Sequence, residues 1–292
     1  EPIPYDLDDK IRVRGDAVDI GAYEYQTSFS IGILGDSLSD EYLHETYSYA
    51  SAWSETLAST DRVNLGVQGA WPEPRRDNGY SQNWARAGAT TETMVTEGQH
   101  LGLAQQSANG EIDVAVMMIG QNDFGPWTET YWAIYNGYAT QQQIDERTAI
   151  AFEYIEEAVM AVAQEGVPFL VSTIVDYGAA TFTRELYPDP AKRNLVSQVI
   201  DDVNQQTLAL CEQLAVPVID IPGMTEEFLG TTLAPIDSIT AFGNTLTNTA
   251  GVAATNMFVD DGIHPHTLLQ ACIGNLVLEG LHQGYNADVS LI

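Results

Sequence analysis

The sequence Ile31-Gly32-Ile33-Leu34-Gly35-Asp36-Ser37-Leu38-Ser39-Asp40 decides how the rest of the chain is interpreted. An apolar run of strand type ends at Gly35, where the lack of a side chain allows a sharp backbone bend. Asp36 and Ser39 then favour a turn, because their side chains compete for backbone hydrogen bonds. In an α/β protein, a serine at the carboxyl end of a strand lies where such folds bind ligands. Ser37 is therefore either a helix cap or a nucleophile, and other segments must decide between the two.

Short apolar runs alternate with longer amphipathic segments from residue 28 onwards. The pattern predicts strands over 29–35, 62–67, 113–119, 168–174 and 216–221, and helices over 47–59, 90–107, 141–165, 190–214 and 266–283. This alternation is typical of right-handed βαβ units, in which helix layers cover a parallel sheet. We therefore predict an α/β fold with a mostly parallel, five-stranded sheet. Two long loops, 68–82 and 222–257, are expected near the carboxyl ends of strands.

The composition excludes several kinds of partner. The chain has 41 acidic and 11 basic residues and a formal net charge of −30, which repels nucleic acid and anionic membranes. No stretch approaches the roughly 20 apolar residues that a membrane-spanning helix needs. Cys211 and Cys272 are expected to be buried free thiols in helices, with a disulfide between them as the alternative.

Three further segments carry residues suited to chemistry. Gly88 precedes a predicted helix, where backbone N–H groups are free and the helix dipole favours negative charge. Asn122 follows the most apolar strand. It is either part of a tight turn or a residue whose side-chain amide points into the same cleft. Asp261 lies three residues before His264, so its carboxylate can bind Nδ1 and leave Nε2 facing outward. That pair is the orienting acid and the base of a catalytic triad.

These four segments, in this order, resemble the sequence blocks of the SGNH (GDSL) hydrolase superfamily over residues 29–284. The resemblance implies a flavodoxin-like, three-layer α/β/α sandwich over residues 27–292 that hydrolyses esters without a metal or a cofactor. It implies that Ser37 is the nucleophile, His264 the general base and acid, and Asp261 the residue that orients His264. The oxyanion hole would consist of the N–H groups of Ser37 and Gly88 and the side-chain amide of Asn122.

Other polar residues receive structural roles. Asp36 and Asp123 are expected to hold the nucleophile loop by hydrogen bonds. His266 is expected at a helix start or at the rim of the site, and His44, His100 and His282 at the surface. The alternative is a metal site formed by Asp260, Asp261, His264 and His266, which would leave the serine segment unexplained.

Aromatic residues near the predicted site suggest a substrate surface. Trp84, Phe124, Trp127, Tyr131 and Trp132 can stack on a sugar or an aryl group or wall an acyl pocket, with core packing as the alternative. Arg75, Arg76 and Arg86 cluster in an arginine-poor chain, and one of them can meet a carboxylate or sulfate.

Residues 1–26 differ from the rest in being charged and rich in turns. Their stretch 17–25 resembles the closing segment of secreted, right-handed parallel β-helix domains, including those with a choice-of-anchor module. That resemblance implies an extracellular protein with a β-helix upstream, and a plain N-terminal arm is the alternative. The chain begins at Glu1 without methionine, as expected of a processed or excised segment.

Together these features predict a secreted esterase that removes short acyl groups, above all acetyl, from a carbohydrate. A lipase or arylesterase for small lipophilic esters is one alternative. A non-catalytic carbohydrate-binding module on the same fold is another.

Overall fold

The computed structural model describes residues 13–14, 17–18, 29–42, 47–60, 63–72 and 78–285. Its central sheet consists of β3 (Phe29–Gly35), β4 (Val63–Asn64), β7 (Val114–Met118), β8 (Phe169–Ser172) and β9 (Val218–Ile219). The strands lie in the order β4-β3-β7-β8-β9, and every neighbouring pair is parallel. This is the flavodoxin-like order, in which ligands bind where the winding reverses, between β3 and β7. The predicted fold class is confirmed.

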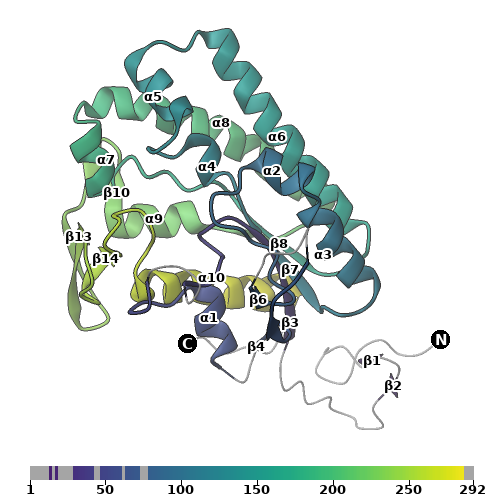
Figure 1. Ribbon diagram of the computed structural model, residues 1–292. Helices are drawn as coiled ribbons and strands as arrows, with labels where there is room; N and C mark the ends of the chain where they lie inside the picture. The colour runs from purple at the N-terminus through teal and green to yellow at the C-terminus, as the bar shows by residue number, and fades with distance from the viewer. Residues whose placement is uncertain are drawn as a thin grey trace.

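Helices cover both faces of this sheet (Figure 1). One face carries α1 (Trp53–Ala58) and α10 (Thr267–Tyr285), and the other carries α2 (Thr91–Thr96), α3 (Gln99–Ala108), α6 (Gln141–Ala163) and α8 (Pro190–Leu214). Buried side chains alternate between the two faces, as the period of a strand requires. Ile33 and Met118 pack on the α1/α10 side, whereas Leu34 and Met117 pack on the α2/α6 side.

Several predicted boundaries differ from the structure. The helix expected over 90–107 is divided at Gly98, whose φ of 77° interrupts the helix between α2 and α3. The helix expected over 47–59 is only α1. Four helices were not predicted: α4 (Gln121–Phe124), α5 (Glu129–Asn136), α7 (Thr181–Leu186) and α9 (Ile221–Leu229). All four have 4 to 9 residues, which is too short for a clear helical period.

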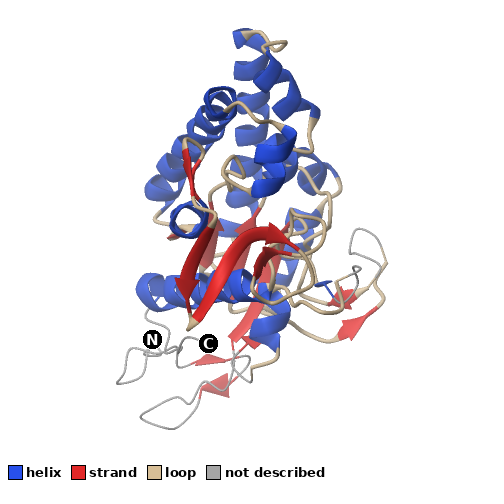
Figure 2. Cartoon of the chain, turned by 90° about the vertical axis from the view of Figure 1, so that its left-hand side faces the viewer, coloured by secondary structure: helices blue, strands red, loops and turns tan. Residues whose placement is uncertain are grey.

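The prediction of a long loop over 222–257 is wrong. After α9 the chain forms the hairpin β10 (Gly230–Thr231) and β11 (Ala234–Pro235), then a three-stranded sheet of β12 (Ser238–Ala241), β13 (Asn244–Ala250) and β14 (Asn256–Phe258). This sheet lies at the front in Figure 2. Its buried Asn248 donates hydrogen bonds to Ala179 O and Ile236 O, at 3.1 and 2.9 Å. Because a polar residue fills this buried position, the sequence lacks the apolar pattern by which a strand is predicted. The loop expected over 68–82 likewise contains the paired strands β5 (Gln68–Gly69) and β6 (Gly79–Tyr80).

Few of the N-terminal residues are described. Strand β1 (Val13–Arg14) pairs with β2 (Ala17–Val18), and the other residues of 1–26 lie outside the described residues, as do His44, Arg75 and Arg76. The β-helix resemblance and the boundary at residue 26 therefore stay predictions.

Both cysteines are free thiols, as predicted. Cys211 is buried in α8 and Cys272 is half-buried in α10, and burial raises the pKa of each thiol to about 11. Within the described part of the chain, no helix combines the length and the hydrophobicity that crossing a membrane requires.

Asn204 of α8 secures the chain beyond β8, and its loss should destabilise the fold. Its Oδ1 accepts a hydrogen bond from Ile174 N at 2.7 Å, and its Nδ2 donates to Ile174 O at 2.9 Å. We expect Asn204→Ala to lower the free energy of unfolding by about 2–4 kcal/mol, because two buried backbone groups lose their partners. Urea denaturation measures this change. The neighbouring exposed variant Gln205→Ala should stay within about 0.5 kcal/mol of wild type; equal losses in the two variants would contradict the assignment.

Candidate active site

Ser37 lies in the turn that follows β3. A Cβ at Gly35 would lie 2.4 Å from the carbonyl oxygen of Met118, so the close approach of β3 and β7 requires a glycine there. Asp36 is buried, and its Oδ1 accepts a hydrogen bond from Leu38 N at 2.9 Å across the serine. The turn that carries the half-buried Ser37 is therefore fixed on both sides.

Asp36, next to Ser37, has a strongly shifted pKa. Burial raises the pKa of Asp36 to about 7, although the hydrogen bond from Leu38 and the charge of His264 oppose the rise. The other carboxyl oxygen, Oδ2, is buried and has no hydrogen-bond partner among the described residues. The carboxyl beside Ser37 is thus strongly desolvated, and it lies within electrostatic reach of the imidazole.

Asp261 and His264 lie in the loop between β14 and α10. Oδ1 of Asp261 accepts hydrogen bonds from the N–H groups of Ile263 and His264 at 2.7 and 3.0 Å, and Oδ2 lies 2.5 Å from His264 Nδ1. Burial raises the pKa of Asp261, but the hydrogen bond and charge of His264, with smaller help from Tyr47, outweigh it and lower the pKa to about 2. An ionised Asp261 keeps a proton on Nδ1, so the lone pair of the neutral ring is on Nε2.

Nε2 of His264 is the atom that the resemblance assigns to proton transfer. It is buried and has no hydrogen-bond partner within the described residues. A hydrogen-bonded chain joins its loop to the serine turn: Gln270 Nε2 donates to Leu38 O at 3.5 Å and to the Tyr42 hydroxyl at 2.7 Å, and that hydroxyl donates to Pro265 O at 2.9 Å. The segments of Ser37 and His264 are therefore connected through α10.

Two tyrosines that the sequence analysis missed hold the acidic side of this loop. The Tyr47 hydroxyl donates to Asp261 Oδ2 at 2.6 Å, and its ring lies 5.4 Å from that of His264. The Tyr49 hydroxyl donates to Asp260 Oδ1 at 2.5 Å. The only sequence signal was a cluster of tyrosines after the serine segment, and no spacing rule connects it to a loop more than 200 residues away.

Asn122 and Gly88 bring hydrogen-bond donors to the same end of the sheet. Trp127 Nε1 donates to Asn122 Oδ1 at 2.9 Å, and Asn122 Nδ2 donates to Ala89 O at 2.9 Å. These two bonds fix the orientation of the amide and leave its second N–H unused. The N–H groups of Gly88 and Ser37 also make no hydrogen bond within the described residues. Gly88 has a φ of 80°, a conformation that favours glycine.

Asp123 has a different role from the one predicted. Its carboxylate accepts hydrogen bonds from Thr91 N and Oγ1 at 2.9 and 3.0 Å, so it ties α4 to the start of α2 rather than holding the nucleophile loop. Burial raises the pKa of Asp123 to about 6, against the lowering effect of the Thr91 bonds. This contact sets Asn122 and the Gly88 segment relative to each other.

The aromatic candidates separate into two groups. Substrate contact is a wrong prediction for Trp84 and Tyr131, which are at most 5% exposed and belong to the core. Phe124 is also buried, but it lines a hollow between α5 and α6. The indole of Trp84 donates to Gln106 Oε1 at 2.8 Å. Trp127 is half-buried and bound to Asn122, whereas Trp132 is 47% exposed.

The remaining histidines have structural environments. His100 is buried, contrary to the prediction, with Nε2 3.6 Å from Glu157 Oε1, and burial lowers its pKa. His266 is also buried, and its Nδ1 accepts the Thr267 N–H at the start of α10, as expected of a helix-start residue. His282 is exposed. Within the described ranges, no cluster of three or more His, Cys, Asp or Glu side chains is arranged to hold a metal ion, Asp260 and Asp261 included.

Comparison with known proteins gives the family. The chain matches the model of the GDSL-like lipases and acylhydrolases over residues 31–277. No curated protein matches it in sequence.

Three solved structures are similar in backbone. A GDSL-like lipase from Bacteroides thetaiotaomicron VPI-5482 has 10% identity and a TM-score of 0.48, covering 87% of this chain and 88% of that one. The acetyl xylan esterase AlAXEase has 12% identity and a TM-score of 0.48, with 86% and 99% covered. A psychrotrophic esterase from Pseudoalteromonas sp. has 12% identity and a TM-score of 0.45, with 89% and 100% covered.

The family match spans most of the chain, and it confirms the resemblance inferred from the four sequence segments. The chain therefore belongs to the GDSL-like lipase/acylhydrolase family and is an ester hydrolase.

Proposed function

We propose that the protein is a serine esterase that removes short acyl groups, above all acetyl, from a carbohydrate through an acyl-enzyme intermediate. The observation that carries the proposal is the Asp261–His264 pair. Its short Nδ1 contact leaves Nε2 without a partner, in electrostatic reach of the carboxyl that precedes Ser37.

In the proposed reaction Ser37 Oγ attacks the ester carbonyl carbon while Nε2 of His264 accepts the hydroxyl proton. The carbonyl oxygen becomes an oxyanion and receives hydrogen bonds from the N–H groups of Ser37 and Gly88 and from the Asn122 amide. Collapse of this intermediate breaks the bond to the alcohol, which leaves with the proton from His264. Water then attacks the acyl-enzyme by the same steps and releases the acid. Asp261 stays ionised throughout and stabilises the imidazolium.

The choice of substrate class is supported by the charge of the chain and by its N-terminal segment. The negative net charge favours an uncharged substrate. The sugar context comes from the β-helix resemblance of residues 17–25.

A substrate panel tests this function. We expect hydrolysis of p-nitrophenyl acetate to exceed that of the butyrate and octanoate esters, and acetate to be released from acetylated xylan. Ser37→Ala should abolish both activities. Activity that rises with acyl length and is absent on acetylated xylan would favour a lipase or arylesterase. Glycan binding without hydrolysis of any ester would instead indicate a non-catalytic carbohydrate-binding module.

The oxyanion hole can be tested through Asn122 and its partner. Asn122→Ala should lower kcat by about 10²–10³ with little change in KM. Trp127→Phe keeps a ring over Gly125 but removes the indole N–H that orients the amide, so we expect kcat to fall by about tenfold at constant KM.

Trp71→Phe is the matched control for that experiment, since it removes an indole hydrogen bond that goes to Gly79 O and not to Asn122. Its kcat should equal that of wild type. A normal kcat in Trp127→Phe would show that the amide is oriented by other contacts.

Tyr47→Phe should change the pH dependence of the rate. In this variant Asp261 Oδ2 accepts a hydrogen bond from His264 alone, so the carboxylate stabilises the imidazolium more strongly. Because only the neutral ring accepts the serine proton, the acid limb of the kcat/KM profile should move to higher pH. Tyr49→Phe, whose hydroxyl bonds Asp260 instead, should leave the limb in place. An identical profile for Tyr47→Phe and wild type would exclude this role for Tyr47.

A further inference from the structure

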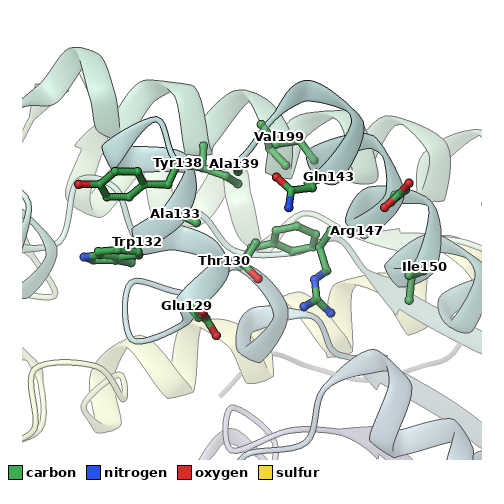
Figure 3. Close-up of a pocket in the computed structure, with 14 residues that line it drawn as sticks. Glu129, Thr130, Trp132, Ala133, Tyr138, Ala139, Gln143, Arg147, Ile150 and Val199 are labelled. Carbon is green, nitrogen blue, oxygen red and sulfur yellow. The ribbon is translucent and has the colours of Figure 1, made fainter.

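We propose that a groove between α5 and α6, separate from the Ser37 turn, binds a neutral saccharide. The groove has a volume of about 590 Å³, within the range of small-molecule sites. Figure 3 shows its labelled side chains, which come from α5, the connection to α6, α6 itself and α8. None of the residues assigned to the triad or the oxyanion hole lines it.

One side of the groove is an exposed aromatic platform. Trp132 and Tyr138 are 47% and 67% exposed, and their ring centroids lie 5.0 Å apart with the planes at 32°. Figure 3 shows the two rings one above the other at one edge of the hollow. Large exposed aromatic side chains that lie together at a hollow mark binding surfaces. A flat apolar face of this kind packs against the C–H face of a sugar ring.

The opposite side of the groove offers planar polar groups. Gln143 and Arg147 project from α6 in Figure 3, and Glu129 and Glu146 also line the hollow. Arg147 is exposed and makes no hydrogen bond or salt bridge within the described residues, in a chain with only 11 basic residues. Neighbouring hydroxyl groups of a sugar can accept from Arg147 and Gln143 and donate to the two carboxylates.

Other classes of ligand fit this lining less well. A fatty chain would remove water from the four polar side chains and return no hydrogen bond. An anion would meet one guanidinium but also the carboxylates of Glu129 and Glu146, within a field set by the net charge of −30. The combination of an aromatic face with both donors and acceptors matches a neutral, hydroxyl-rich ligand.

The groove is close to the oxyanion side of the catalytic site. Phe124, which lies two residues after Asn122 in α4, is one of the residues that line the groove. A saccharide held in the groove would raise the local concentration of its acyl groups at Ser37. This kinetic consequence rests on the proposed function, whereas binding in the groove does not.

Isothermal titration calorimetry with xylohexaose, cellohexaose and mannohexaose tests the proposal. We expect wild type to bind at least one of these neutral oligosaccharides. Trp132→Ala and Arg147→Met should each weaken that binding by about tenfold, through loss of ring stacking and of charged donors respectively. Phe242→Ala is the control, because Phe242 is a 61% exposed aromatic residue outside the groove, and it should bind and hydrolyse like wild type.

The outcomes separate the groove from the catalytic function. The groove proposal is overturned if none of the three oligosaccharides binds, if both groove variants bind as tightly as wild type, or if trigalacturonate binds more tightly than the neutral sugars. Wild-type hydrolysis of p-nitrophenyl acetate is scored independently. If the protein hydrolyses the ester but binds no saccharide, only the groove proposal fails. If it binds a saccharide, and Trp132→Ala and Arg147→Met weaken that binding, but it hydrolyses no ester, only the esterase proposal fails. Thermal melts establish that both variants are folded.

Discussion

The contact between β3 and β7 at Gly35 is the constraint on which the rest of the site depends. The parallel register pairs Gly35 with Met118. Only glycine fits at position 35, because the carbonyl oxygen of Met118 leaves no room for a side chain. The two strands consequently end at the same level. Ser37 follows two residues after one strand end, and Asn122 follows four residues after the other. The proposed nucleophile and a proposed oxyanion donor therefore both follow directly after neighbouring strand ends, without a long loop between strand and residue.

Three aspartates around this point show how one residue type acquires different properties. Asp36 and Asp123 are desolvated, and their pKa values rise to about 7 and about 6. Asp261 is also partly buried, but the imidazole and the tyrosine hydroxyl lower its pKa to about 2. Asp261 has the lowest pKa of the three, and it is the one that contacts His264, the proposed base. The other two act through backbone and hydroxyl donors that fix the turns.

Local patterns in the sequence were sufficient for the framework. Strand 29–35 and helix 190–214 have the predicted bounds, because each has a long apolar period and a clear end. The order of Ser37, Gly88, Asn122, Asp261 and His264 led to the family. Contacts between distant segments were not predictable. Tyr47 reaches Asp261 across 214 positions. The bond from Trp127 to Asn122 is local, but nothing in the sequence pattern pointed to it, and Trp127 was expected to face substrate. Strand β13 was missed because its two buried positions are Leu246 and Asn248, so the sequence shows no run of alternating apolar residues.

The proposed reaction centre spans both helix layers. Asn122 and the Gly88 segment are tied to α2 and α4 on one side of the sheet, whereas His264 precedes α10 on the other. The proposed base thus lies beside the core under α10, whereas Asn122 and the Gly88 segment are attached to the core under α2. Trp127 joins the two sides, because its indole orients the Asn122 amide while its ring packs against Tyr177 of the α10-side core. A small slide of α10 would therefore change the proton-transfer distance directly and the orientation of the amide through Trp127. Substitutions in the α10-side core can in this way alter proton transfer and charge stabilisation together.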